Sequence, residues 1–164
     1  MDNQRITHPF PPLYHHLSET LILGSFPSVK SRETMFFYGH PQNRFWKVLS
    51  IIFQEEFPVT MEDKKKLVLN NKLALWDSIH SCTITGSSDS SVKDVVPNDI
   101  SGIIKNSKIN RIFCNGTLSY KMYMKFIFPE LGIKAIRLPS TSPANAAYSL
   151  ERLVLEWKMI RTVE

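Results

Sequence analysis

Four short apolar runs divide the chain, and each has the length of a strand. They occupy residues 20–24, 73–76, 111–114 and 133–138. Continuous apolar runs of this length, bounded by turn-forming residues, are typical of strands that are buried on both faces. We therefore predict four interior strands at these positions.

Apolar residues recur at helical spacing between and after these runs. The spacing predicts helices over residues 43–54, 61–70, 97–104 and 118–128, and a last helix from residue 150 to the C-terminus. Asn43 is suited to cap the first of these helices, because its side chain can accept a bond from a free backbone N–H. Strand and helix thus alternate along the chain. This order predicts an α/β fold with a mostly parallel sheet of four strands and helices on both faces.

Two segments show neither pattern. Residues 1–19 contain three prolines and are predicted to be an extended lead-in. Residues 81–91 are rich in Ser, Thr, Gly and Asp and are predicted to be a long loop. No repeat, linker or low-complexity tract interrupts the chain, so we expect residues 1–164 to form one domain.

Composition restricts the chemistry more than the fold. The net charge of +5 favours a polyanionic partner without identifying one. The two cysteines, Cys82 and Cys114, belong to no CxxC pair, and two thiols cannot build an iron–sulfur cluster or a four-thiolate zinc site. They suit reduced interior thiols and a cytoplasmic location. No apolar run approaches the ~20 residues that cross a bilayer, and the N-terminal stretch has no secretory signal, so we expect no membrane partner.

Side chains with useful chemistry follow each predicted strand. The first strand is followed by Ser25, Phe26, Pro27, Tyr38, His40, Asn43 and Arg44. The later strands are followed by Asp77 and His80, by Asn115 and Gly116, and by Ser140, Thr141, Ser142, Pro143, Ala144 and Asn145. The carboxyl ends of parallel strands meet at one edge, where ligands bind. An aromatic ring, amides and an arginine gathered there suit a planar, hydrogen-bonding ligand next to a phosphate.

Each of these residues also has an ordinary structural interpretation. Tyr38 can be a loop aromatic that packs on the core, and Asn43 can be only a helix cap. His40 can have a structural role and not a catalytic one. The chain has no GxGxxG or GxxxxGK[ST] loop, no GxSxG elbow and no HExxH, so nucleotide triphosphate, serine hydrolase and zinc protease chemistry lack support.

Two distant segments resemble the signature motifs of the uracil-DNA glycosylase superfamily. Residues 23–28 and 38–49 resemble its first motif, and residues 138–146 with the helix start at 149–153 resemble its second. The likeness is greatest to the hypoxanthine-DNA glycosylase branch, and the mismatch-specific thymine/uracil branch is also similar. The resemblance implies a three-layer α/β/α sandwich around a four-stranded sheet. It further implies hydrolysis of the N-glycosidic bond of a deaminated base in DNA, without a metal or a cofactor.

The resemblance also implies roles for individual residues. Asn43 and His40 would be catalytic, by likeness to the His-Pro-x-Asn segment of that branch. The flipped base would lie in a pocket made by Gly24, Ser25, Phe26, Pro27, Tyr38 and Asn115, with Tyr38 stacking on its ring. DNA would be held by Arg44, Ser140, Thr141, Ser142, Ala144 and Asn145. Because the chain has no heptad repeat, we expect a monomer.

Two positions depart from the superfamily pattern. Phe26 stands where other branches carry an Asp or Asn that handles the attacking water, and a phenyl ring can neither donate nor accept that bond. Ala144 stands where the mismatch branch has a leucine-type wedge, so weaker wedging, or help from Tyr148, is expected. Two alternatives therefore stay open: a uracil or mismatch glycosylase, and an inactive nucleic-acid-binding module of the same fold.

Overall fold

The centre of the molecule is a sheet of four parallel strands. In the computed structural model, which describes residues 3–161, the strands β2 (Thr20–Gly24), β3 (Leu73–Asp77), β6 (Arg111–Asn115) and β7 (Ala135–Leu138) pair in the order β3-β2-β6-β7. All three pairings are parallel, so the four carboxyl ends meet at one edge of the sheet. The predicted α/β fold with this sheet is confirmed. The first two residues of the predicted lead-in and the last three of the predicted final helix lie outside the described part.

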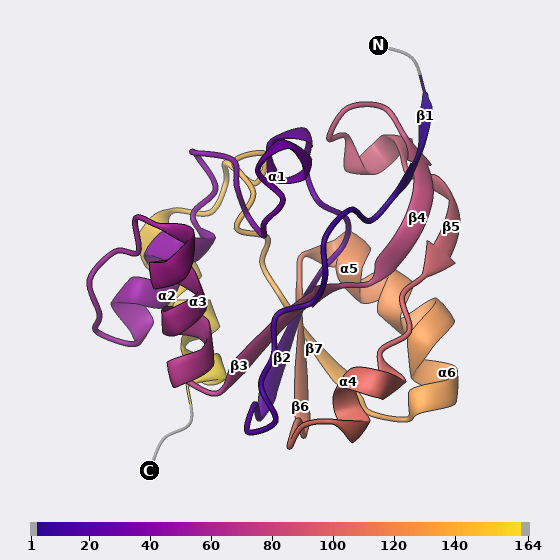
Figure 1. The fold of residues 1–164 in the computed structure, drawn as a ribbon. Coiled ribbons are helices and arrows are strands. Elements are labelled where there is room, and N and C mark those ends of the chain that lie inside the picture. The colour runs from indigo at the N-terminus through magenta and orange to yellow at the C-terminus, as the bar shows by residue number, and fades with distance from the viewer. Residues whose placement is uncertain (1–2, 162–164) are drawn as a thin grey trace.

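Helices cover both faces of this sheet and make three layers, as the resemblance implies. On one side lie α2 (Phe45–Ile52), α3 (Met61–Asn70) and α7 (Leu150–Trp157), as Figure 1 shows. The edge of the Phe45 ring meets the face of Trp157, with centroids 5.8 Å apart, where α2 packs on α7. Both side chains are fully buried, so this pair closes one of the two helical layers.

The other side carries α4 (Ser101–Lys105), α5 (Thr117–Met122) and α6 (Phe128–Leu131) (Figure 1). A continuous helix over residues 118–128 was predicted, but a π-helical turn at Tyr123–Ile127 separates α5 from α6. Pro129 is the cause: proline has no N–H and its ring clashes with the carbonyl four residues earlier, so regular α-helix cannot pass through it. The turn re-aims the chain toward β7.

A second, antiparallel sheet stands beside the α5–α6 layer. It contains β1 (Gln4–Thr7), β4 (Ile79–Ile84) and β5 (Lys93–Pro97), in the order β1-β4-β5. The predicted loop over residues 81–91 is therefore wrong in its first part, and the extended lead-in contains a paired strand. Ser and Thr weakened the apolar signal of β4, although Ile79, Cys82 and Ile84 form a small buried cluster. The partner strand β1 lies far away in sequence, so no local pattern indicated the pairing.

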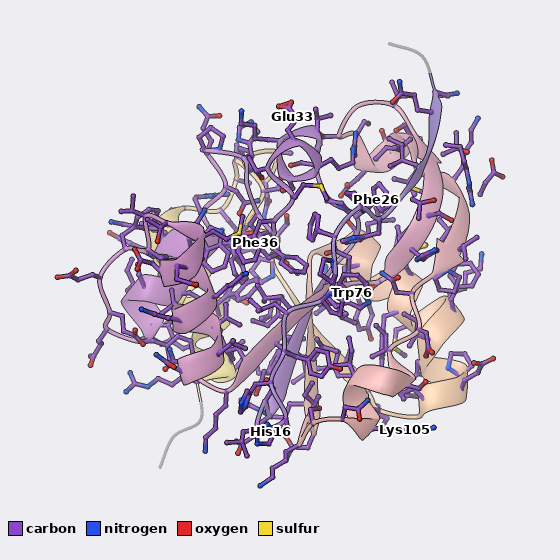
Figure 2. The ribbon with its side chains drawn as sticks, in the orientation of Figure 1. His16, Phe26, Glu33, Phe36, Trp76 and Lys105 are labelled. Carbon is purple, nitrogen blue, oxygen red and sulfur yellow. The ribbon has the colours of Figure 1, made fainter. Side chains whose placement is uncertain are left out.

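The main core lies on both faces of the four-stranded sheet. β2 and β3 are buried along their whole length, which explains their uninterrupted apolar sequences. Figure 2 shows Phe36 and Trp76 in the interior, whereas Glu33 and Lys105 lie at the periphery. Short helix α1 (Val29–Thr34) covers the carboxyl edge of the sheet and leads into the aromatic loop that follows. No helix within residues 3–161 is long and apolar enough to cross a membrane.

Both cysteines are free and buried, which makes their reactivity a test of the fold. Burial raises the pKa of the Cys114 thiol to about 12 and also raises the pKa of Cys82. Because a raised pKa keeps a thiol protonated below that value, neither residue carries the reactive thiolate at pH 8. We expect the native protein to react with a chromogenic disulfide at roughly a hundredth of the rate of the unfolded chain or less, because both thiols are protonated and shielded from the reagent. A fast reaction of one equivalent in native buffer would contradict the packing described above.

Candidate active site

A cavity of about 1060 Å³ opens at the carboxyl edge of the four-stranded sheet. Its wall includes thirteen of the fourteen residues to which the sequence assigned a role: Gly24, Ser25, Phe26, Pro27, Tyr38, His40, Asn43, Asn115, Ser140, Thr141, Ser142, Ala144 and Asn145. Loops after β2, β6 and β7 supply these residues, so segments more than 100 residues apart share one wall. The cavity is large enough for a flipped nucleotide.

Thr141 joins three of these loops through hydrogen bonds. Its hydroxyl donates to Asn43 Oδ1 over 2.8 Å and accepts a bond from Asn115 Nδ2 over 3.0 Å. Its backbone N–H donates to Asn115 Oδ1, also over 3.0 Å. Thr141 is completely buried. Since buried polar groups are costly to leave unpaired, this chain of bonds holds the Asn43 and Asn115 amides in fixed orientations.

The Asn43 side chain is left with donors to offer. Its Oδ1 accepts bonds from the Thr141 hydroxyl and from the backbone N–H of Phe45, 2.9 Å away. A carbonyl oxygen has two lone pairs, so both are in use, and the Phe45 N–H can only donate, which fixes the amide orientation. The Nδ2 group donates to no residue within 3–161. The predicted N-cap role is wrong in its position, because Arg44 is the N-cap residue of α2 and Asn43 precedes it. Asn43 still accepts a bond from the first N–H of α2, and it lines the cavity wall.

Arg44 does not line the cavity, although the sequence placed it among the DNA contacts. Its guanidinium donates to the backbone carbonyls of Ser142, Asn145 and Tyr148, the bond to Asn145 being 2.9 Å long. Its backbone N–H donates to the Thr141 carbonyl. Arg44 thus braces the loop that carries the second signature motif. The phosphate contact expected of it stays a prediction.

Phe26 is explained by the second sheet. Its half-buried ring packs against the small cluster of Ile79, Cys82 and Ile84, and His8 meets it edge to face with centroids 5.9 Å apart. The guanidinium of Arg32, a residue of α1, lies 5.8 Å from the centroid of the Phe26 ring. An Asp or Asn here would give up these apolar contacts. The side chain that replaces the usual water-handling residue therefore belongs to the packing of this site.

Tyr38 lies deeper than a surface platform. Its ring stacks on Phe45, with centroids 3.9 Å apart and an interplanar angle of 21°, so one face is already covered. Burial strongly raises the pKa of its hydroxyl, and the negative charge of Asp77 adds to the rise. Its backbone adopts a left-handed φ of 52°, which turns the side chain toward the sheet edge. Stacking of Tyr38 on a flipped base stays a prediction, and only the other ring face is open for it.

His40 and His80 have different surroundings. His40 lines the cavity, and its Nδ1 accepts a bond from the Gln42 N–H over 3.1 Å, which leaves Nε2 as its free nitrogen. His80 is exposed and lies outside the cavity, where its Nδ1 contacts Asn98 Oδ1 at 3.2 Å. The catalytic role of His40 stays a prediction.

Sequence reasoning assigned no role to three residues on the cavity wall, Asp77, Lys121 and Arg137, or to His8 behind Asp77. Asp77 is buried at the end of β3 and bonded to His8, which comes from the segment after β1. Asp77 was noted as a strand-end residue without a role, whereas nothing local marked His8. Lys121 and Arg137 are exposed cations on the wall, and Arg137 donates to Thr117 Oγ1 over 3.2 Å. Their position at the carboxyl edge was the signal that could have found them.

Comparisons with known proteins identify the class of this fold and site. The chain superposes on a solution NMR structure from Methanosarcina acetivorans, described as a candidate uracil DNA glycosylase, with a TM-score of 0.81 and 31% identity over 96% of each chain. The fold is therefore that of the uracil-DNA glycosylases. No protein-family model matches the chain.

Two curated relatives narrow this class to a family. The chain is 32% identical to a hypoxanthine DNA glycosylase of M. acetivorans over 94% of its own length and 98% of that protein. It is also 32% identical to the protein of the same name from Methanosarcina barkeri, over 83% of its length and 86% of the relative. The chain belongs to the hypoxanthine DNA glycosylase family.

Replacing Thr141 by valine tests the network between the loops. Valine keeps the shape but removes the hydroxyl, so Asn115 Nδ2 loses its acceptor and Asn43 Oδ1 loses a donor. We expect the free energy of unfolding to fall by about 1–3 kcal/mol, the cost of leaving buried polar groups unpaired. Chemical denaturation measures this value. Thr141→Ser is the matched control and should retain most of the stability; equal losses in both variants would assign the effect to the methyl group.

Proposed function

We propose that this protein removes hypoxanthine from DNA by hydrolysing the N-glycosidic bond of deoxyinosine and leaving an abasic site. Membership of the hypoxanthine DNA glycosylase family supports the reaction class. The observation that carries the proposal is the Asn43 amide, whose oxygen is held by two donors while its N–H groups remain free at the wall of a base-sized cavity.

DNA would approach the rim of this cavity. The exposed cations Lys121 and Arg137 lie on its wall, and Ser140 and Ser142 add hydroxyl groups on either side of the buried Thr141. Such groups contact phosphates and position the duplex without reading sequence. The net charge of +5 also favours the binding of a polyanion such as DNA. Ala144 is exposed next to residues 140–142, so a methyl group and the nearby Tyr148 ring would face the gap that the flipped nucleotide leaves.

Bond cleavage would then rely on the leaving purine. The C1′–N9 bond breaks with its electron pair moving onto the base, and positive charge develops on the sugar. An N–H of Asn43 can donate to a ring nitrogen of the purine and stabilise the negative charge that develops there. Water adds to C1′ and releases a proton to solvent, while the purine takes up a proton. His40 lines the cavity and has its Nε2 free, so this nitrogen can deliver the proton to the purine.

Phe26 is compatible with this division of work. Because no carboxylate or amide occupies that position, strong activation of water by it is absent. A purine that is stabilised by hydrogen bonds leaves readily, so orientation and electrostatics can supply most of the acceleration. The same residue is the observation that favours the inactive binding module. The name of the solved relative favours a uracil glycosylase instead.

A panel of duplexes tests the proposed reaction. Each duplex holds one hypoxanthine, xanthine, uracil or mismatched thymine, and alkaline strand scission reports the abasic site. We expect hypoxanthine to be excised fastest under single-turnover conditions, because a weakly pairing purine is cheap to flip. Faster excision of uracil would favour the uracil glycosylase, and DNA binding without any excision would favour the inactive module.

Asn43→Asp separates two roles of this residue. If Asn43 acts as a donor to the leaving base, aspartate removes that donor and adds a repelling charge, so single-turnover excision of hypoxanthine should fall by about 10²-fold or more. If Asn43 instead activates water, aspartate should do this at least as well and the rate should hold. Asn110→Asp, at an exposed position outside the cavity, is the charge-matched control.

We further propose that residues 1–164 work as one domain, as a monomer in the cytoplasm. The continuous alternation of strands and helices around one main core supports the first point. Sedimentation of the free protein and of its DNA complex tests the second.

A further inference from the structure

The deep end of the cavity holds a carboxylate that the proposed reaction does not use. Asp77 ends β3 and pairs in register with Gly24, the last residue of β2. Only 4% of Asp77 is exposed, and that part belongs to the cavity wall. A carboxylate in such a place costs free energy unless it is bonded. The burial of Asp77 therefore indicates that its carboxylate has bonding partners or a function at this position.

His8 orients this carboxylate. Its Nε2 donates to Asp77 Oδ2 over 2.6 Å, and the bond lies in the interior. The imidazole is enclosed by the rings of Phe10 and Trp76, each with its centroid 4.5 Å away, and its backbone N–H donates to the His80 carbonyl. Oδ2 is thereby engaged. Oδ1 receives no hydrogen bond from any residue in the described range, so it remains an acceptor.

The Tyr38 hydroxyl lies next to this acceptor. It is buried and makes no hydrogen bond of normal geometry with residues 3–161, and the Asn115 side chain is its polar neighbour. Both groups crowd the same glycine: a Cβ placed on Gly24 would lie 2.3 Å from Asp77 Oδ1 and 3.1 Å from Tyr38 Oη. A buried hydroxyl without a partner is rare in native proteins. Glycine at position 24 thus leaves room for an unpaired donor beside an unpaired acceptor.

A donor beside an acceptor is the complement of a lactam edge, which offers C=O next to N–H. When adenine is deaminated, its C6 amino group becomes a carbonyl and its N1 gains a hydrogen. The order of donor and acceptor along that edge is thereby reversed. A base whose sugar stays near the exposed Ala144 would point the edge farthest from the glycosidic bond toward the buried Asp77. In a purine, this edge carries C6 and N1.

We propose that Asp77 and Tyr38 read the lactam edge of the flipped base: Tyr38 Oη donates to O6 of hypoxanthine, and N1–H donates to Asp77 Oδ1. This inference rests on the proposed function and names the groups that select its substrate. His8 acts as a positioning residue, because it aims the carboxylate and does not touch the base. Adenine would place its N1 lone pair against a carboxylate and is rejected. Guanine shares the lactam edge, so its exclusion depends on room for its 2-amino group.

The assignment also gives Tyr38 a role other than stacking. A hydroxyl that bonds to O6 lies near the plane of the base, whereas a stacking ring lies above it. Tyr38→Phe distinguishes the two, because phenylalanine retains the stacking surface and loses only the hydroxyl. Asp77→Asn retains an acceptor for His8 and turns an N–H₂ group toward the base in place of Oδ1.

Equilibrium binding tests the inference without requiring cleavage. The probes are duplexes that contain one 2′-fluoroarabino inosine or one 2′-fluoroarabino adenosine, which resist hydrolysis of the glycosidic bond. We expect the wild-type protein to prefer the inosine duplex by about 10-fold or more, the scale of one bidentate contact with a base edge. Asp77→Asn and Tyr38→Phe should each remove most of this preference. His8→Phe should reduce it while keeping the ring in its aromatic surroundings.

Matched controls and thermal unfolding exclude a general loss of structure. Tyr14→Phe and Asp99→Asn change the same groups outside the cavity and should retain the preference. If Asp77→Asn does not fold, Tyr38→Phe tests the donor half alone. An unchanged preference in folded Tyr38→Phe and Asp77→Asn, or equal weakening of both duplexes, would overturn the inference. A preference in binding with no excision of hypoxanthine would instead overturn the proposed function and leave this reading of the pocket intact.

Discussion

The site depends on one buried hydroxyl. Thr141 sits where the loops after β2, β6 and β7 meet, and it bonds to Asn43 and Asn115 at the same time. These loops come from opposite ends of the chain, and the parallel sheet brings them to one edge without fixing their side chains. The network supplies the missing order, because Thr141 is fully buried and its bonds would be costly to break. Arg44 supports the same loop from behind through three carbonyls.

The second sheet changes what the cavity can contain. It supplies an apolar wall that accepts Phe26, and the segment after β1 supplies His8 to Asp77. The position where relatives in other branches handle water is thus occupied by packing, and the ionisable groups lie deeper. In the proposed complex, Asn43 would lie near the leaving bond and Asp77 near the far edge of the base. Such a division suits a reaction in which the leaving group, and not the nucleophile, is stabilised.

Much of the fold could be predicted from the sequence, because β2 and β3 are buried on both faces and read as unbroken apolar runs. The strand β4 was missed, since its serine and threonine residues resemble a loop and its partner lies more than 70 residues away. Most of the residues that the strand ends and the two motifs indicated line the cavity, and their roles stay predictions. Arg44 lies outside the cavity wall, because its guanidinium bonds to loop carbonyls that no sequence pattern reveals, and its contact with phosphate stays a prediction. His8 could not be found, since only the tertiary fold brings it to Asp77 across 69 positions.

The attachment of β1 has a consequence for how the enzyme's selectivity could be lost. This strand pairs only with β4, at the margin of the molecule, while the four-stranded sheet is complete without it. Detachment of β1 from β4 would withdraw the His8 imidazole from the Asp77 carboxylate and leave the main core in place. Discrimination between bases would then fade at lower temperatures than global unfolding, so fidelity and folding would have separate thermal limits.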